Sequence, residues 1–427
     1  MAEQREKQSW EQDVFNEETP DSDIRYKTLS WQFVALLMIS EIVSNGMLSL
    51  PSALAVIGIV PAVIIIVFLG IFALFTAKVL IDFKLNHPSV HSMGDAGYII
   101  GGPVVREILS LGTVIFAIFA TVIVVAFQSY VHLIDPSLWQ QGGQLITGQQ
   151  ALATLSNNGL CNVILVLIFA VATFLSSLPR TLGNLSWLGL FSTSLIVLAG
   201  IVGMAGAGSS PVEGRVVSVT INSSFFDAFL AVTNPVFSYA GHFMFFILIS
   251  EMRHPQDAMK AAWWLQGFST VFYTIFAVVM YIYIGNSVAS PAFLSLPPRW
   301  AKAAFAIALG NFLIATHTLL GWSIWIFLCL AGTAIAFVLA VALPIFSYLV
   351  GITASLFASW YTYGLAGFFW IHDTRHQKAL FKRPIGLTLA VFTILAGAFI
   401  CVAGTYVSIQ LIIDAYEEGI VGSPFTC

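Results

Sequence analysis

Long apolar runs recur along the chain, separated by short polar segments. From about residue 27 onward, most runs contain roughly twenty residues with few charges. A run of this length crosses the hydrocarbon core of a bilayer, about 30 Å thick, as an α-helix, whereas the strands of a membrane barrel are shorter and alternate apolar with polar positions. The pattern therefore predicts an all-α polytopic membrane protein.

We place eleven transmembrane helices on this pattern. They are expected at about 31–58, 61–81, 108–133, 160–178, 185–205, 225–250, 261–284, 303–319, 320–339, 344–370 and 385–413. The uncharged stretch 303–372 holds three of them only if the turns are very short. The polar segment 82–103 reads as a loop, with an interfacial helix as an alternative, and the glutamine-rich segment 134–158 falls between two helices.

Basic residues near the helix ends agree with this count. They precede the first helix, flank the loop after the second, and follow the fourth, sixth and tenth: Arg25, Lys27, Lys78, Lys84, Arg106, Arg180, Arg253, Lys260, Arg375, Lys378, Lys382 and Arg383. Loops rich in basic residues stay in the cytosol, so these positions should share one side of the membrane. The basic loop after the tenth helix reaches that side if the uncharged stretch holds three helices. Arg215, Arg299 and Lys302 are exceptions.

The same rule orients the chain. Residues 1–26 are acidic and almost free of large aliphatic side chains, a composition typical of a disordered tail, here expected in the cytosol. Residues 27–413 form the predicted transmembrane domain, and 414–427 a short extracytosolic tail. Asn222 begins an Asn-Ser-Ser glycosylation pattern in a loop that this topology places outside.

Composition excludes several function classes. Apolar residues make up 58% of the chain and charged residues 9%, and the net charge of -4 comes without a basic cluster, so no nucleic-acid partner is expected. The cysteines at 161, 329, 401 and 427 have neither metal-ligand spacing nor a disulfide framework. The predicted helices contain no paired aspartates, metal cluster, or nucleophile and base motif, which argues against an enzyme and predicts no metal or other cofactor.

The first predicted helix carries unusual residues at membrane depth. Glu41 lies near its middle, and Ser44, Asn45, Gly46 and Met47 follow. A charge there is costly, and irregular backbone is tolerated only where it meets protein, water or substrate. We interpret 44–47 as a helix break lining a cavity. The alternative is a continuous helix whose small residues pack against a neighbour.

The sixth predicted helix is interrupted in a comparable way. Asn234-Pro235 is followed by Phe237-Ser238-Tyr239-Ala240-Gly241-His242, and proline removes a backbone hydrogen bond while glycine permits an unwound turn. The two interrupted helices are five apart, and an inverted repeat of five helices would bring them face to face at the membrane midplane. Half-helix amino termini could hold a carboxylate there, and exposed carbonyls an ammonium, which suits an amino acid.

These motifs carry a family resemblance. Residues 44–51 (SNGMLSLP), 237–242 (FSYAGH) and 251–255 (EMRHP) resemble the first-helix and sixth-helix signatures of the amino acid/auxin permease family, and in particular its fungal neutral amino acid permeases of the methyltryptophan-resistance type. The resemblance implies an eleven-helix, five-plus-five inverted-repeat bundle that imports neutral aliphatic and aromatic amino acids with protons at the plasma membrane. The segment 122–141 and the short junction near 315–322 depart from the family pattern.

The candidate roles follow from site chemistry. Backbone groups of Ser44, Asn45, Gly46, Met47, Phe237, Ser238, Tyr239, Ala240 and Gly241 are expected to bind substrate, with Phe237 and Tyr239 lining an apolar pocket or simply packing between helices. Glu41 and His242 are the coupling candidates, alone or as a pair, although each could equally serve a structural hydrogen bond.

The expected partners are neutral amino acids and the lipid bilayer, with protons as the coupling ion and sodium not excluded. Two alternatives to proton-coupled import by alternating access remain open at this point. One is sodium-coupled symport. The other is an amino-acid-sensing transceptor with little flux.

Overall fold

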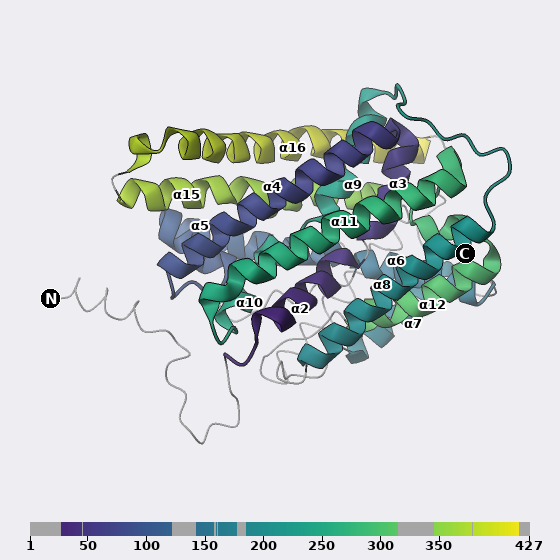
Figure 1. Ribbon diagram of the computed structural model, residues 1–427, viewed down its shortest axis with the longest axis horizontal. Coiled ribbons are helices and arrows are strands. Elements are labelled where there is room, and N and C mark those ends of the chain that lie inside the picture. The colour runs from purple at the N-terminus through teal and green to yellow at the C-terminus, as the bar shows by residue number, and fades with distance from the viewer. Residues whose placement is uncertain are drawn as a thin grey trace, which may run out of the picture.

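The computed structural model describes residues 27–44, 46–121, 142–157, 159, 161–176, 185–314, 346–377 and 379–417 (Figure 1). Within these ranges every named element is a helix. Among the described residues, 5 helical stretches are long and apolar enough to cross a membrane each, and a bent pair near the amino terminus makes a sixth. The predicted all-α class is therefore what the structure has.

Described helices overlap the predicted spans except the ninth, which lies outside the described residues, as do 122–133 of the third, residues 160, 177 and 178 of the fourth and 315–319 of the eighth. In chain order they are α2 (Trp31–Val43) with α3 (Gly46–Ile57), α4 (Ile59–Asn86), α5 (Met93–Thr121), α7 (Asn162–Ser176), α8 (Leu185–Ser209), α9 (Phe225–Ser238) with α10 (Phe245–Ser250), α11 (Ala258–Ile284), α12 (Pro298–Ile314), α14 (Phe346–Thr353) continued by a π-helix (Ala354–Gly364) and α15 (Leu365–His376), and α16 (Pro384–Glu417).

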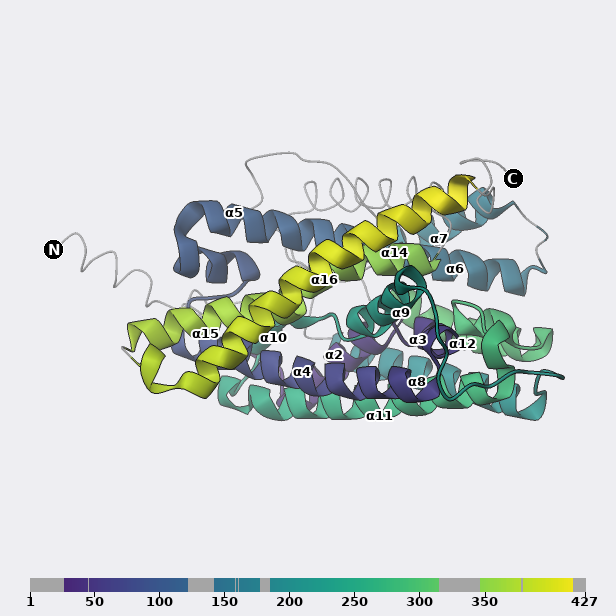
Figure 2. The same cartoon turned by 90° about the horizontal axis from the view of Figure 1, so that it is seen from above.

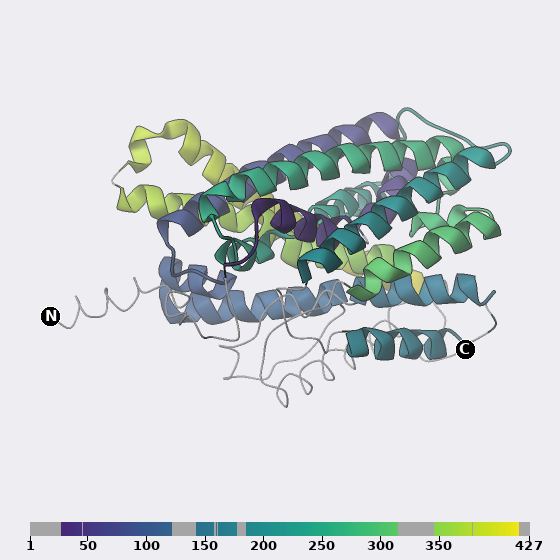
Figure 3. The same cartoon turned by 60° about the horizontal axis from the view of Figure 1, so that its bottom comes forward.

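Two polar segments are more helical than expected. The glutamine-rich segment contains α6 (Gly142–Leu155), which contacts α5, α7 and α12, with α5 along the lower side of the bundle in Figure 3. Thr147 and Ala151, one turn apart, are fully buried. This helix therefore packs in the bundle through a face of small residues rather than through a long apolar run. In the segment after α4, the first turns of α5 are separated from its span by a kink at Gly101 and Gly102, which matches the interfacial-helix alternative.

The turn between the first two spans is as short as predicted. Only Gly58 separates α3 from α4, and its φ of 88° lies in the left-handed region that favours glycine. A β-carbon at this position would also lie 2.6 Å from the α-carbon of Thr220. The loop between α8 and α9 packs on this turn, because the backbone amides of Ile59 and Val60 donate to carbonyls of that loop.

The first and sixth spans run side by side in opposite directions. At one end, Leu29 before α2 pairs with Met252 after α10 in an isolated bridge. At the other end, the Ser223 hydroxyl before α9 donates to the Val56 carbonyl in α3. The start of one span therefore meets the end of the other, as an inverted repeat requires.

The two spans differ from the last helix in their position in the bundle. In the 18-residue apolar window of Phe225–Ser250, 83% of the residues are buried, whereas in that of Pro384–Ala415, within α16, 17% are buried. Figure 2 shows α16 crossing the outside of the bundle, with α9 beside it in this view. The broken sixth span lies at the centre, and α16 presents most of its apolar surface outward.

Candidate functional site

The first span is broken where the sequence predicts. Helix α2 ends at Val43, Ser44 leaves helical geometry with ψ of -102°, and α3 starts at Gly46. The two halves meet at an angle of 49°. Asn45, a predicted substrate residue, lies outside the described residues. The continuous-helix alternative is therefore wrong for this span.

The sixth span is broken as well. Helix α9 ends at Ser238, Tyr239 has φ of -96° and ψ of 4°, and regular structure resumes only with a short 3-10 turn (His242–Met244) before α10. Gly241 is neither helical nor extended, with φ of -163° and ψ of 6°. Tyr239, Ala240 and Gly241 therefore form the non-helical segment, at the Ala-Gly part of the predicted interruption. Asn234-Pro235 does not interrupt the backbone as expected, because α9 continues through Pro235 to Ser238.

The two breaks touch one another. A β-carbon added to Gly46 would lie 2.7 Å from the α-carbon of Ser238, and one added to Gly241 would lie 2.2 Å from Cδ1 of Ile42. The Ser238 hydroxyl donates to the Gly46 carbonyl at 2.8 Å. Because Gly46 and Ser238 are in direct backbone contact, a bound molecule would lie alongside the two breaks rather than between these residues.

A tyrosine from a third span joins the two breaks. The hydroxyl of Tyr273 on α11 lies 3.0 Å from the Ile42 carbonyl and 2.7 Å from the Ser238 carbonyl, close enough to donate to either. Both carbonyls belong to the last turns of broken half-helices. The last carbonyls of a helix have no intrahelical N–H donor, so they can accept a hydrogen bond from another group. Sequence reasoning missed Tyr273, because nothing in α11 distinguishes it from other packing aromatics.

A buried asparagine engages the first break from the opposite side. Asn311 on α12 is fully buried; its Oδ1 accepts from the Ser44 hydroxyl, and its Nδ2 donates to the Ser40 carbonyl at 3.2 Å and to the Ser192 hydroxyl at 2.8 Å. It thereby links α2, α8 and α12. Sequence reasoning missed Asn311 too, although an amide within the uncharged stretch was an available signal.

The predicted aromatic residues differ in their surroundings. Phe237 is half-buried, while Tyr239 is fully buried. The Tyr239 hydroxyl lies 3.0 Å from the Ile66 carbonyl and 3.1 Å from Thr270, and its ring packs edge-on against Tyr273. In this conformation Tyr239 packs between α4 and α11, and Met47 is likewise fully buried.

His242 lies deep in the bundle. Its Nε2 is 2.8 Å from the Ala73 carbonyl and 3.2 Å from the Thr76 hydroxyl, both on α4, and its ring stacks on Phe245. A carbonyl only accepts, so Nε2 carries the proton and Nδ1 is the free acceptor of a neutral ring. Among the described residues Nδ1 has no hydrogen-bond partner.

Glu41 lies one turn before the first break, in α2, and is half-buried. His242 makes its hydrogen bonds to α4 rather than to Glu41, so the structure does not contain the Glu41 and His242 pair considered from the sequence. Asn222, the predicted glycosylation acceptor, is exposed in the loop before α9. That exposure is compatible with modification.

Comparison with known proteins identifies the family. A family model described as transmembrane amino acid transporter protein matches residues 27–331. The chain belongs to this family. It is also 29% identical, over 96% of its length and 90% of the relative's, to the N amino acid transport system protein of Neurospora crassa. The resemblance noted in the sequence is therefore confirmed, and the chain is a multi-pass membrane protein of an amino acid transporter family rather than an enzyme.

Solved structures support the fold. A manganese transporter from Eremococcus coleocola matches with a TM-score of 0.53 and 12% identity, covering 94% of this chain and 100% of that one. A nucleobase-cation-symport-1 family transporter in a closed conformation matches with a TM-score of 0.51 and 12% identity, covering 94% and 95%. At these identities the likeness concerns the fold alone. It confirms the five-plus-five inverted-repeat class with broken first and sixth helices.

Proposed function

We propose that this member of the transmembrane amino acid transporter family imports neutral aliphatic and aromatic amino acids together with protons, by alternating access, across the plasma membrane. The observation that carries the proposal is the direct contact of two broken half-helix pairs at Gly46 and Ser238. Such breaks leave backbone amides and carbonyls for a small zwitterion in a place where lipid offers no partner.

Neutral substrates suit the side chains that surround the breaks. Met47, Phe237, Tyr239 and Ala240 are apolar or aromatic, and a charged substrate side chain buried among them would need a counter-charge. Backbone contacts serve the amino and carboxylate groups that all amino acids share. The selectivity would then come from shape and apolar contact, which discriminates weakly between similar side chains and predicts a broad substrate range.

Glu41 and His242 are the proposed coupling residues. Both lie within one turn of a break, where protonation could bias the closing of the half-helices. His242 has a buried Nδ1 that could accept a proton if the bundle opens to water. The Oε2 atom of Glu41 is buried too, so Glu41 could likewise take up a proton only if the bundle opens to water.

The deciding experiment is uptake of radiolabelled neutral amino acids into liposomes that contain the purified protein. An inward proton gradient should drive accumulation above equilibrium, a protonophore should abolish it, and a sodium gradient alone should not replace it. Accumulation driven by sodium without protons would overturn proton coupling. Binding of substrate without accumulation would overturn transport in favour of a sensing role.

Two variants test the two proposed coupling residues individually in the same assay. Glu41→Gln should abolish accumulation while exchange of labelled for unlabelled substrate persists, because exchange needs no net proton movement. His242→Gln keeps an N–H donor for the Ala73 carbonyl but cannot be protonated. Proton dependence that is unchanged in both variants would remove these residues from the coupling mechanism.

A further inference from the structure

A cluster of histidines and an aspartate joins the ends of α4 and α15, away from the two breaks. His87 is the residue that ends α4, and His372 and Asp373 lie near the end of α15, beyond its apolar part. One ligand atom from each of these three residues lies within 4.8 Å of the other two. The site lies at the basic end of the bundle, where the chain enters its first span.

The distances within this cluster resemble those of a metal coordination shell. Nε2 of His87 is 2.8 Å and Nδ1 of His372 is 3.5 Å from Oδ1 of Asp373. In a tetrahedral zinc site with bonds of about 2.0 to 2.1 Å, neighbouring ligand atoms are about 3.3 Å apart. Only small side-chain shifts would be needed to place an ion between these three atoms.

The aspartate is held in an orientation that suits this role. Asn86 donates from Nδ2 to Oδ2 of Asp373 at 2.8 Å, which leaves Oδ1 directed at the histidines. Hydrogen bonds of this kind orient the ligands of metal sites and are usual around them. Asn86 and His87 are consecutive, so the end of α4 supplies one ligand and the group that positions another.

A fourth ligand is within reach. His376 lies one turn after His372 on α15, and the two ring centroids are 4.4 Å apart. Histidines four residues apart on a helix present their nitrogens on one face, a spacing that zinc sites use. His376 is exposed, so it can rotate toward the ion, or water can take its place.

The cluster combines imidazoles with a carboxylate. Burial lowers the pKa of the His372 imidazole. Burial raises the pKa of the Asp373 carboxyl, but hydrogen bonds from His87 and Asn86 outweigh this and hold the pKa below its usual value. The nearby Asp82 is paired with Lys78, and Arg383 is the cation that lines the adjoining cavity.

From this geometry we propose that His87, His372 and Asp373, with His376 or water, bind one divalent transition-metal ion, Zn²⁺ by preference, and so tie the end of α4 to α15. Two imidazoles and a carboxylate match the borderline character of Zn²⁺ better than that of Mg²⁺ or Ca²⁺, which prefer oxygen ligands. Nitrogen and oxygen ligands must be deprotonated to bind a metal ion, so the affinity should fall on acidification.

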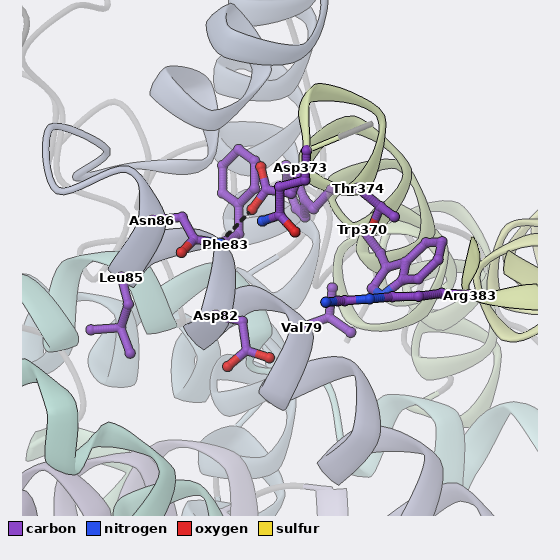
Figure 4. Close-up of a pocket in the computed structure, with 11 residues that line it drawn as sticks. Val79, Asp82, Phe83, Leu85, Asn86, Trp370, Asp373, Thr374 and Arg383 are labelled. Carbon is purple, nitrogen blue, oxygen red and sulfur yellow. Dashed lines mark hydrogen bonds between the residues drawn. The ribbon is translucent and has the colours of Figure 1, made fainter. Parts of the chain in front are cut away.

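A cavity gives the ion a route to the site. It measures about 260 Å³ and adjoins the cluster through Asn86 and Asp373, with Phe83, Trp370 and Arg383 among its other lining residues. Figure 4 shows Asn86 and Asp373 side by side in this cavity, joined by their hydrogen bond. A hydrated ion can therefore reach the carboxylate before it contacts the histidines.

The test is equilibrium dialysis of the full-length purified protein, free of any histidine tag, against Zn²⁺ at pH 7.5, with the bound metal quantified. One Zn²⁺ per chain is expected above background. His372→Ala and Asp373→Asn should each weaken binding at least about tenfold, and Asn86→Ala, which removes only the orienting bond, by about tenfold. His254→Ala is the matched control, because His254 is exposed at the same end of the bundle, and it should bind like the original protein.

A second measurement does not depend on the variants folding. Co²⁺ substituted into a tetrahedral nitrogen and oxygen site gives intense visible absorption, which Zn²⁺ should abolish by competition and a shift to pH 5 should reverse. The proposal is overturned if the unaltered protein shows no such bands, or if His372→Ala binds as much Zn²⁺ as the original protein. Either result would leave the cluster as a hydrogen-bonded clasp between two helices.

Discussion

The two broken spans are held in place by different chemistry. Around the first break, an amide and hydroxyls form a polar cluster in which Asn311 links Ser44 to Ser192. Around the second break, the partners are aromatic or imidazole side chains, with Tyr239 and His242 both reaching carbonyls of α4. The first break is therefore tied to α8 and α12, and the second to α4 and α11.

Among the residues that the structure describes, a few groups join one break to the other. The contact of Gly46 with Ser238 and the position of Tyr273 between two carbonyls connect them directly. If the half-helices move during transport, these junctions couple their movements, whereas Asn311 and His242 anchor each break to its own surroundings. The comparison predicts that variants at the junctions should disturb both breaks and variants at the anchors should disturb one.

The largest effect is expected from Gly46→Val. The β-carbon of the valine would lie 2.7 Å from the Ser238 α-carbon. Because that atom belongs to the backbone, relieving the clash would require the helix itself to shift. Overpacking of this kind costs about 1 to 3 kcal/mol and would separate the breaks. Uptake should fall at least a hundredfold. Gly267→Val is the matched control, because Gly267 on α11 faces open space; equal uptake by the two variants would contradict the close contact.

Asn311→Ala should come next, with its damage confined to the first break. The substitution leaves the Ser44 hydroxyl and the Ser40 carbonyl buried without their partner, at a cost of about 1 to 3 kcal/mol. The thermal unfolding midpoint in detergent should fall accordingly. Ser194→Ala, on an exposed face of α8, should leave it unchanged. A midpoint that does not move in Asn311→Ala would show that this cluster does not hold the break.

Tyr273→Phe should have an intermediate effect that involves both breaks. It keeps the ring and removes one hydroxyl, so the cost to stability is about 1 kcal/mol. The substrate concentration for half-maximal uptake should rise severalfold, because neither half-helix end is fixed as before. Tyr406→Phe, at an exposed position of α16, serves as the control and should transport normally. The prediction is wrong if Tyr273→Phe transports with unchanged affinity.

Ser238→Ala should have the smallest effect. Its hydroxyl donates to the Gly46 carbonyl and is also 2.9 Å from the Asn234 carbonyl of its own helix, so the two acceptors compete for one proton. Loss of the hydroxyl should cost about 0.5 to 1.5 kcal/mol and reduce uptake less than Tyr273→Phe does. A larger loss than for Tyr273→Phe would make this bond the principal junction instead.

Local patterns predicted the breaks because the reasons for them are local. Gly46 and Gly241 lie at the two breaks, and the backbone freedom of glycine acts within one turn, whereas Pro235 remains inside α9. The partners could not be predicted in the same way. Tyr273 and Asn311 are far from the breaks in sequence, and a tyrosine or an asparagine in an apolar helix has many possible neighbours.

The glutamine-rich segment contains a helix that the hydropathy pattern did not predict. Helix α6 buries Thr147 and Ala151 against other helices, so its environment is protein rather than lipid and it needs no long apolar run. The His87 and Asp373 cluster is a similar case. The two residues are 286 positions apart, and neither polar segment by itself indicates that they meet.

The sequence by itself determined the membrane class, the order of the spans and the two points where helical backbone fails, because the length of an apolar run and the conformational limits of glycine and proline act within each segment. Tertiary structure alone decided that Gly46 meets Ser238, that Tyr273 and Asn311 hold the breaks, and that His87 lies beside Asp373. These contacts depend on how helices distant in sequence pack together, which the pattern of any one segment does not specify.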